Sequence, residues 1–248
     1  MVKPAGPNPI DAPGTDEAAW RAWPVLRQLA VADITSWASA VILAAHPDDE
    51  VLGVGGLMSR LASAGARLRL VAVTDGEASH PGIARPGELA ERRAAETAAA
   101  LAALGAAGAQ VVRLQLPDAG LAGRQDEITA QLRDLSDGFD VCLAPWENDV
   151  HADHEAVGRS ARRAGGQAEL AFYPIWTWHW ASPGDRRVPW SGALRVPLPP
   201  AAAARKRAAI QCFASQLEDR PGTGPMLTAG TLAHFTRDAE VLFPARQP

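Results

Sequence analysis

Short apolar runs alternate with amphipathic stretches along the chain up to residue 173. Five runs are rich in Val, Leu and Ala and have the length of strands, at 40–45, 67–74, 110–116, 139–144 and 169–173. Apolar residues at helical spacing follow at 57–64, 88–104, 127–135 and 154–164. Gly105 and Gly165 close two of these helices. Strands and helices that alternate in this way are typical of a parallel sheet with helices on both faces.

This alternation predicts an α/β fold, with a Rossmann-like, mostly parallel sheet in the strand order 3-2-1-4-5. The length of 248 residues suits one domain with a continuous core. We expect a Pro/Gly-rich lead segment at 1–38 and a single domain at 39–248. The pattern weakens after residue 173 into a Trp/Pro-rich stretch, a short strand near 194–198 and a helix at 201–217. We expect 174–248 to form a variable, substrate-side cap region.

Composition and charge narrow the classes of partner. Acidic residues outnumber basic ones, 28 to 24, and the formal charge of -4 argues against binding to nucleic acid. The N-terminal residues lack the apolar stretch of a secretion signal, and no run is long enough to cross a membrane, so we expect no membrane partner. Cys142 and Cys212 lie far apart and are expected to be reduced, which favours a cytoplasmic location. A homo-oligomer is compatible with the sequence, and the oligomeric state stays open.

Two clusters of His and Asp residues follow the first and the fourth predicted strands. One cluster is His46-Pro47-Asp48-Asp49-Glu50, and the other is Asp149-Val150-His151-Ala152-Asp153-His154. In the order 3-2-1-4-5 these two strands are neighbours, and ligands bind at the carboxyl ends of such strands. We therefore expect the clusters to meet in space, although about a hundred residues separate them in the chain.

The residue types of the clusters match a catalytic zinc site, in which His and carboxylate ligands leave a position open and bound water is acidified to a pKa of roughly 7. Three residues fit such a ligand set: His46, Asp49 and His154. Asp48, beside a ligand but not one itself, is placed to take the proton from water. His151 is placed to hydrogen-bond the oxyanion and to protonate the leaving nitrogen, with Asp153 orienting its ring. The chemistry predicts Zn²⁺ and leaves Fe²⁺ or another divalent metal open.

Each cluster also has a simpler interpretation. The acids at 48–50 could cap a helix N-terminus, where carboxylates satisfy free N–H groups and the helix dipole. His151 and His154, three residues apart, could mark an exposed helix start, because a lone His-x-x-His is a weak metal signal. The presence of both clusters, each after a parallel strand, favours the metal site.

The motifs resemble those of the PIG-L/LmbE-like N-acetylglucosaminyl deacetylase family. The resemblance lies in Ala45-His46-Pro47-Asp48-Asp49-Glu50, in Gly55-Gly56 and in His151-Ala152-Asp153-His154. Further landmarks are similar at Arg93-Ala94-Ala95-Glu96, Pro117-Asp118-Ala119-Gly120 and Ser215-Gln216. The string AHPDDE is the most specific of these motifs.

The resemblance implies roles for individual residues, and these agree with the chemistry of the two clusters. It implies that the metal ligands are His46, Asp49 and His154. It implies that Asp48 is the base and that His151 stabilises the transition state or acts as an acid. Contacts to the sugar are implied for Arg93 and Asp118.

Several other residues have two interpretations. His80 lies in a loop after the second strand and either is solvated or lines the pocket. The stretch 176–180, with Trp176, Trp178, His179 and Trp180, either offers platforms for sugar rings or packs into the core. The glycines at 53, 55 and 56 do not complete a dinucleotide fingerprint, because Met58 stands at the third glycine position. They favour close backbone packing instead.

The sequence thus predicts a metal-dependent hydrolase that removes an N-acetyl or related N-acyl group from an amino sugar of the N-acetylglucosamine type, using water activated by the metal. Two alternatives stay open. One is a nucleotide-binding transferase or oxidoreductase on the same sheet, and the other is a carbohydrate-binding or metal-binding protein without turnover. Neither alternative requires both Asp48 and His151. The glycoconjugate itself is not predicted.

Overall fold

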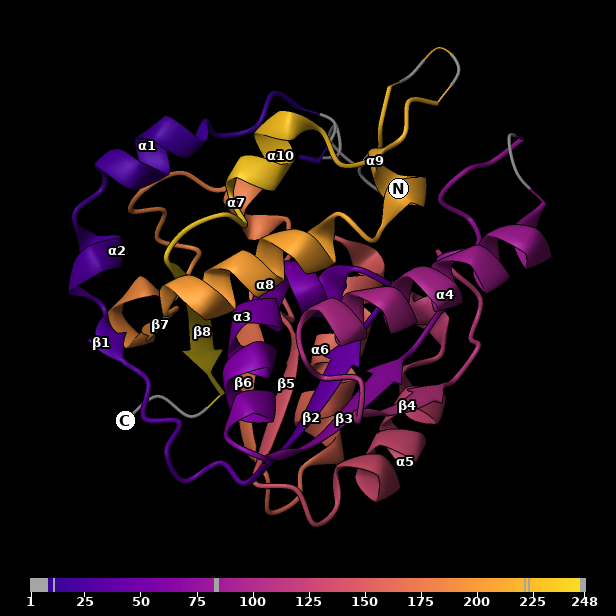
Figure 1. Cartoon of the computed structure of the whole chain (residues 1–248), viewed down its shortest axis with the longest axis horizontal. Helices are drawn as coiled ribbons and strands as arrows, with labels where there is room; N and C mark the ends of the chain where they lie inside the picture. The colour runs from indigo at the N-terminus through magenta and orange to yellow at the C-terminus, as the bar shows by residue number, and fades with distance from the viewer. Residues whose placement is uncertain (1–8, 11, 83–84, 221, 223, 246–248) are drawn as a thin grey trace, which may run out of the picture.

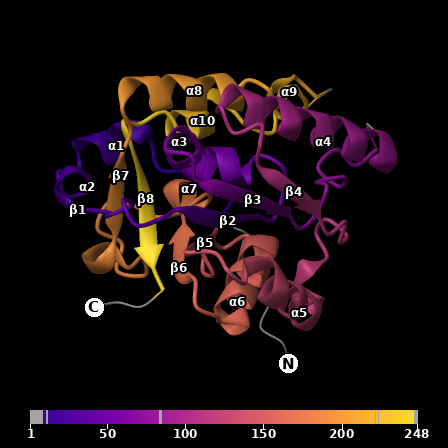
Figure 2. The same cartoon turned by 60° about the horizontal axis from the view of Figure 1, so that its bottom comes forward.

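An eight-stranded sheet with helices on both faces forms the centre of the protein (Figure 1). The computed structural model describes residues 9–10, 12–82, 85–220, 222 and 224–245. Helices α3 (Asp49–Ser63), α4 (Pro86–Ala103) and α8 (Pro200–Ile210) cover one face of the sheet, and α5 (Gln125–Ser136) and α6 (Ala152–Ala164) cover the other (Figure 2). The fold class predicted from the sequence, a mostly parallel α/β sheet between two helical layers, is confirmed.

Five parallel strands make up the half of the sheet that positions the predicted site. They are β2 (Ser39–Ala44), β3 (Arg67–Ala72), β4 (Gln110–Arg113), β5 (Val141–Pro145) and β6 (Glu169–Tyr173). All pairs among them are parallel, and their order is β4-β3-β2-β5-β6. This is the expected order 3-2-1-4-5. Strands β2 and β5 are buried over their whole length, as strands covered on both faces must be.

The other half of the sheet differs from the prediction. Beyond β6 the order continues with β8 (Ala239–Pro244), β7 (Leu194–Pro197) and β1 (Ala30–Val31). Strand β8 runs antiparallel to both β6 and β7, and β1 is parallel to β7. The sequence predicted neither β1 nor β8, and it assigned the strand near 194–198 to a cap. A two-residue strand carries no periodicity, and β8 becomes a strand by pairing with two partners that are distant in sequence.

The helices predicted at 88–104, 127–135 and 154–164 are present with small shifts, whereas the helix expected at 57–64 already begins at Asp49 and several short helices were not predicted. Their bounds are α1 (Glu17–Ala22), α2 (Val25–Gln28), α3 (Asp49–Ser63), α4 (Pro86–Ala103), α5 (Gln125–Ser136), α6 (Ala152–Ala164), α7 (Thr177–Trp180), α8 (Pro200–Ile210), α9 (Ala214–Leu217) and α10 (Ala229–Ala233), with 3₁₀ turns at Leu121–Gly123 and Trp190–Gly192. The helix expected at 201–217 is two helices. Phe213, 1% exposed, turns into the core between them, and its φ of -83° and ψ of 57° interrupt the helix.

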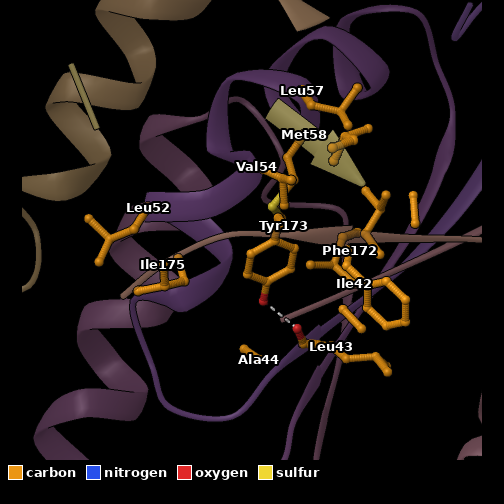
Figure 3. Packing of buried hydrophobic residues seen from close by; sticks show 14 of the residues in the cluster. Ile42, Leu43, Ala44, Leu52, Val54, Leu57, Met58, Phe172, Tyr173 and Ile175 are labelled. Atoms are coloured by element: carbon orange, nitrogen blue, oxygen red, sulfur yellow. Dashed lines mark hydrogen bonds between the residues drawn. The ribbon is translucent and has the colours of Figure 1, made fainter. Parts of the chain in front are cut away.

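The glycines of helix α3 allow it to pack closely on the sheet. A Cβ atom on Gly53 would lie 2.2 Å from Cδ2 of Tyr173, and one on Gly56 would lie 2.5 Å from Cδ1 of Leu198. Tyr173 is fully buried beside Val54, and its hydroxyl donates to the carbonyl oxygen of Leu43 (Figure 3). These contacts agree with close packing as the reason for the glycines.

Helix α3 is kinked at Val54, where φ is -137° and ψ is 18°. The Lys206 ammonium donates to the Leu52 carbonyl at 2.7 Å. The Glu240 carboxylate accepts from the backbone N–H groups of Gly56 and Leu57, at 2.7 and 2.8 Å. A 2.6 Å ion pair joins Lys206 to Glu240. The backbone groups that the kink releases are thus satisfied by one buried ion pair.

The N-terminal lead contacts the Trp-rich segment through a cluster of indole rings. Trp20 lies 5.1 Å from Trp178 and 5.5 Å from Trp190, measured between ring centroids. Its Nε1 donates to the Trp178 carbonyl at 2.8 Å. The domain division at residue 38 stays a prediction. In the part of the chain that the structure describes, no helix is both long and apolar enough to cross a membrane.

Candidate metal and active site

The two His/Asp clusters meet at the carboxyl ends of β2 and β5, which are neighbours in the sheet. The ring centroid of His46 lies 4.9 Å from that of His151 and 5.3 Å from that of His154. His46 follows β2, whereas His151 caps and His154 belongs to α6, the helix that follows β5. The structure therefore brings together all the residues that were predicted to bind the metal or act on water.

The loops that carry these residues contain strained backbone. Among the described residues, positive φ angles outside glycine occur at Asp48 (119°), Gln115 (54°), Ala119 (60°) and Val150 (71°). All four lie in loops at the carboxyl ends of β2, β4 and β5. Such conformations cost about 1–3 kcal/mol each and persist where the surroundings enforce them. The sheet thus holds the candidate site in a geometry that the local sequence does not favour.

Asp49 links the two histidines of the predicted ligand set. Its Oδ1 lies 3.2 Å from His154 Nε2, and its Oδ2 lies 3.5 Å from His46 Nδ1. Asp49 Oδ2 also accepts from the backbone N–H of His46 at 2.9 Å, which fixes the turn. Both ring nitrogens therefore face one carboxylate, and two His and one Asp are a ligand set of catalytic zinc sites.

The other ring nitrogen of each histidine is held by a carboxylate. His154 Nδ1 lies 2.7 Å from Asp149 Oδ2. His46 Nε2 lies 3.2 Å from Asp118 Oδ1 and 3.3 Å from Asp153 Oδ2. Carboxylates in this position fix the tautomer and orientation of metal-binding imidazoles. The residues present thus fit a divalent metal held by His46, Asp49 and His154.

Distance alone would also group His151 with the ligands. Ring nitrogens of His46, His151 and His154 all lie within 4.8 Å of one another. His151 differs from the other two because no carboxylate holds it: its buried Nδ1 has no hydrogen-bond partner among the described residues. The structure places Asp153 against His46, not against His151, and the Asp153 carboxylate also accepts from the N–H groups of Ala119 and Leu121.

Asp149 is a site residue to which the sequence assigned no role. Besides binding His154, it accepts from the backbone N–H groups of Ile175, Trp176 and Thr177, at 3.3, 2.9 and 2.8 Å. Asp149 is fully buried. It therefore joins a candidate metal ligand to the segment that follows β6. The sequence feature that could have indicated Asp149 is its position as the first residue of the second His/Asp cluster.

Arg93 extends from α4 to the candidate site, where its guanidinium contacts neighbouring protein groups. It is 2% exposed, and its Nη2 lies 3.2 Å from Asp48 Oδ2 and donates to the Pro47 carbonyl. Its Nη1 donates to the Gly76 carbonyl at 2.9 Å. Gly76 has a φ of 66°, and a Cβ there would lie 1.8 Å from Nη1. The guanidinium thus fixes Asp48, and the sugar contact predicted for Arg93 stays a prediction.

Burial and neighbouring charges shift the pKa values across the site. Burial raises the pKa of Asp48 to about 7, although Arg93 opposes this. Burial acts against ionisation of Asp49, yet His154 and His46 outweigh it and hold the pKa of Asp49 well below its usual range. Burial and the nearby rings of His154 and His46 lower the pKa of His151 to about 3, which makes it a neutral imidazole.

A cavity of about 230 Å³ opens over these residues. Its polar part includes His46, Asp48, Asp49, Arg93, Asp118, His151 and His154. The cavity also reaches Gln216, whose Nε2 donates to Ser215 Oγ, and Glu96 accepts from both the N–H and the hydroxyl of Ser215. A second cavity of about 490 Å³ near Asp140, Cys142 and Glu169 contains none of the candidate residues.

The remaining histidines do not line this cavity. His80 is 7% exposed, so it is not the solvated loop residue that one interpretation of the sequence suggested, and it lies 2.8 Å from Ser79 Oγ. His179 Nε2 lies 2.9 Å from the Ala12 carbonyl, in contact with the lead segment. Of the tryptophans only Trp176 lines the cavity in the described structure. The other tryptophans of the 176–180 stretch contact aromatic neighbours, as residues that pack in a core do.

The fold and the His/Asp centre define a PIG-L/LmbE-like α/β protein. Residues 41–165, about half of the 248, match the PIG-L family, described as GlcNAc-PI de-N-acetylase. The chain therefore belongs to the PIG-L family, as the motifs indicated.

Individual relatives carry more specific names. The 1D-myo-inositol 2-acetamido-2-deoxy-alpha-D-glucopyranoside deacetylase 2 of Catenulispora acidiphila is 38% identical over 160 residues, 54% of this chain and 52% of that protein. The match thus spans about half the length of this relative. A conserved protein of Thermus thermophilus is 26% identical, with a TM-score of 0.60 over 84% of this chain and 95% of that one. The zinc inhibited form of a teicoplanin deacetylase, 19% identical, has a TM-score of 0.60 over 83% and 97% of the two chains, and shares the fold.

Proposed function

We propose that this protein is a metal-dependent hydrolase that removes an N-acetyl group, or a related N-acyl group, from an amino sugar of the N-acetylglucosamine type. The observation that carries the proposal is the contact of Asp49 with both His46 and His154, 3.5 and 3.2 Å away, next to the buried acid Asp48. Membership of the PIG-L family and the deacetylase names of its relatives support the reaction type.

The residues that would hold the metal are His46, Asp49 and His154. A bound divalent ion supplies Lewis acidity, which polarises the amide carbonyl and acidifies a water molecule. Zn²⁺ suits two imidazoles and one carboxylate, and Fe²⁺ or another divalent ion is compatible with the same donors. Asp149, Asp118 and Asp153 keep the two imidazoles oriented through their second ring nitrogens.

Asp48 is the proposed general base of the reaction, and His151 is the proposed hydrogen-bond donor to the oxyanion. Asp48 takes a proton from the attacking water, and Arg93 holds its carboxylate in place at 3.2 Å. His151 donates an N–H hydrogen bond to the carbonyl oxygen as negative charge develops on it. The leaving nitrogen then receives the proton that Asp48 took from the water, and the products are a carboxylate and a free amine. Asp118, at the polar edge of the cavity, is proposed to contact the sugar.

The test is turnover of a panel of N-acetylglucosaminides by the zinc-loaded protein, with release of amine as the readout. Asp48→Ala and His154→Ala are expected to lower kcat/KM by about 10²–10⁴-fold, the usual contribution of a positioned acid or base. Exposed Asp126→Ala is the matched control and should keep full activity. Undiminished turnover in both site variants would refute the mechanism. Stoichiometric zinc without any turnover would indicate a metal-binding protein instead of an enzyme.

A further inference from the structure

A further cavity, of about 330 Å³, lies at the edge of the sheet, away from the His/Asp centre. Residues of α1, α2, β7 and β8 line it, together with the residues that precede β8. Helices α1 and α2 lie beside β1 and β7 at this edge (Figure 1). In the sheet, β8 and β6 separate β7 from β5, the strand whose end carries the second His/Asp cluster. The described residues that line the edge cavity all differ from those that line the candidate site.

Side chains on one face of β7 and β8 form part of the lining. Arg195 of β7 pairs with Val241 of β8, and Ala239 lies two residues before Val241. Paired residues share a face of a sheet, and so do residues two apart in one strand. Glu240, between the two, points to the other face, where it accepts from N–H groups of α3. The strands therefore present one cation and two small apolar side chains to the edge cavity.

The lead segment adds an apolar surface around an indole ring. Trp23 and Leu26 line the cavity and are half-buried, so part of each side chain stays accessible. The Trp23 ring meets the rings of Trp20 and Trp190 edge to face, with centroids 6.0 and 5.1 Å away. Both of these partners are buried, and they hold the Trp23 ring in place. A fixed, accessible indole suits a flat apolar group of a ligand.

The lining is strongly positive, although the chain as a whole has a formal charge of -4. Its charged residues are one acid, Asp238, and four arginines, Arg21, Arg27, Arg195 and Arg237. Glu17 pairs with two of the arginines: its carboxylate lies 3.0 Å from Arg21 Nε and accepts from Arg237 Nε at 2.9 Å. The charge that remains at the cavity therefore comes mainly from Arg27 and Arg195.

Arg27 and Arg195 have no carboxylate partner in the part of the chain that the structure describes. Arg195 Nε donates to the Leu29 carbonyl at 3.1 Å, which orients the guanidinium and leaves its two Nη groups available. A guanidinium stays charged at any ordinary pH, and its N–H groups match the oxygens of a phosphate or a carboxylate. The edge cavity thus has donors and charge for an anion next to a surface for an aromatic ring.

We propose that the edge cavity binds a small aromatic anion, in which a phosphate or a carboxylate is attached to one aromatic ring. The anionic group contacts Arg27 and Arg195, and the ring packs against Trp23. A volume of about 330 Å³ lies at the lower end of the range of small-molecule cavities, about 300–1,000 Å³, so it suits one ring with its anionic group.

Calorimetric titration of the zinc-loaded protein with four probes tests the proposal. Phenyl phosphate and benzoate carry both parts of the ligand, inorganic phosphate carries only the anion, and phenyl β-D-glucoside carries only the ring. At least one aromatic anion should bind with a Kd of about 3 mM or below, and both partial probes should bind at least about threefold more weakly. The tighter of the two aromatic anions identifies the anionic group. Weaker binding of both aromatic anions, or a partial probe that binds as well as they do, overturns the proposal.

Variants of the lining locate the bound anion. Arg27→Gln and Arg195→Gln should each weaken binding by about tenfold, the range of one charge-assisted hydrogen bond. Arg27 is exposed, so Arg27→Gln should fold as the wild type does. Trp23→Ser should weaken binding severalfold, and Trp23→Phe should retain most of it. Arg207→Gln, exposed on α8, is the matched control and should bind as the wild type does. An unchanged Kd in both arginine variants of the cavity overturns the proposal.

A further variant excludes binding at the candidate metal site, since phosphates and carboxylates also bind metal ions. His154→Ala removes a proposed metal ligand, and it should bind the aromatic anion as tightly as the wild type does. Loss of binding in His154→Ala would assign the anion to the His/Asp centre and overturn the proposal. Because binding is measured without turnover, the result does not depend on the proposed hydrolase activity.

Discussion

Two groups of buried charged residues contact helix α3, and they are built differently. At the kink, Lys206 and Glu240 form a 2.6 Å ion pair whose remaining bonds go to the backbone of Leu52, Gly56 and Leu57. Each charge there has an opposite charge or a peptide group as its partner. All the contacts of this ion pair are thus made within the protein, and they join α8 and β8 to α3.

At the N-terminus of α3, in contrast, several acidic side chains lie close together beside an open cavity, and Arg93 pairs with Asp48 among them. Asp48 and Asp49 are adjacent, Asp118 and Asp153 both face His46, and Glu50 Oε1 is buried without a partner among the described residues. Backbone strain at Asp48 and Val150 adds to the cost of this arrangement. The group at the kink thus satisfies the backbone of α3, whereas the group at the N-terminus places acids together at a cost in stability, in a geometry that suits a cation.

Removal of the metal should have the largest effect of all the changes, and it should lower activity without changing the fold. Treatment with a chelator is expected to lower deacylation by about a thousandfold or more, because the Lewis acid is lost. Added Zn²⁺ should restore it. The far-UV circular dichroism should stay unchanged, since the Lys206 and Glu240 pair does not depend on metal. Full activity after the protein is shown to be metal-free would contradict the prediction.

Lys206→Met should lower the free energy of unfolding without disturbing the candidate metal site. The change leaves the Glu240 charge buried and uncompensated, which costs about 3–5 kcal/mol of unfolding free energy. Denaturant titration measures the loss, and zinc stoichiometry should remain the same. Arg207→Met, on the exposed side of the same helix, should change stability by less than about 0.5 kcal/mol. Equal stability of the two variants would show that the kink does not depend on the ion pair.

Asp149→Asn tests whether the site depends on residues beyond the ligands. Asn keeps the size of the side chain but loses the charge that orients His154, and zinc affinity should fall about 10–100-fold. Competition with a chromophoric chelator measures this affinity. Asp126→Asn, whose side chain is 91% exposed, should bind zinc as the wild type does. Unchanged zinc affinity in Asp149→Asn would show that Asp149 does not contribute to metal binding.

Glu17→Gln should have the smallest effect, a decrease in the free energy of unfolding that depends on pH. Burial opposes ionisation of Glu17, but hydrogen bonds from His234 and Arg237 outweigh it and lower the pKa of Glu17 to about 2. A pKa that is lowered on folding contributes stability that is present above about pH 4.5 and is lost as the pH falls towards 2. The wild type should therefore lose unfolding free energy over this range.

In Glu17→Gln the unfolding free energy should be lower by about 1–2 kcal/mol at pH 7, and the difference should shrink towards pH 2. Denaturant titrations at several pH values measure it. Glu88→Gln, an exposed residue in an ion pair with Arg85, is the control and should show little change. A constant difference across the whole pH range would contradict the role of the Glu17 charge.

Much of the half of the molecule that carries the candidate site could be predicted from the sequence. Strand order and helix pattern placed His46 and His154 together, because ligands bind where adjacent parallel strands end. The contacts that Arg93 and Asp153 make within the protein were harder to predict. Arg93 contacts Asp48, and Asp153 contacts His46, through pairings that depend on the side chains that happen to lie nearby in the fold. For the same reason the sequence did not decide whether the tryptophans bind sugar or pack in the core. Among the described tryptophans only Trp176 lines the cavity of the candidate site.

The sequence by itself determined the five-stranded parallel core, the meeting of the two His/Asp clusters and membership of the PIG-L family. These follow from periodicity and motif spacing, which are properties of short segments. Only the tertiary structure decided that β8, β7 and β1 extend the sheet, that Lys206 and Glu240 bridge the kink, and that Asp149 joins His154 to the backbone of the segment after β6. Each of these depends on backbone or side-chain groups that find their partners across the fold, and no local pattern specifies such a partner.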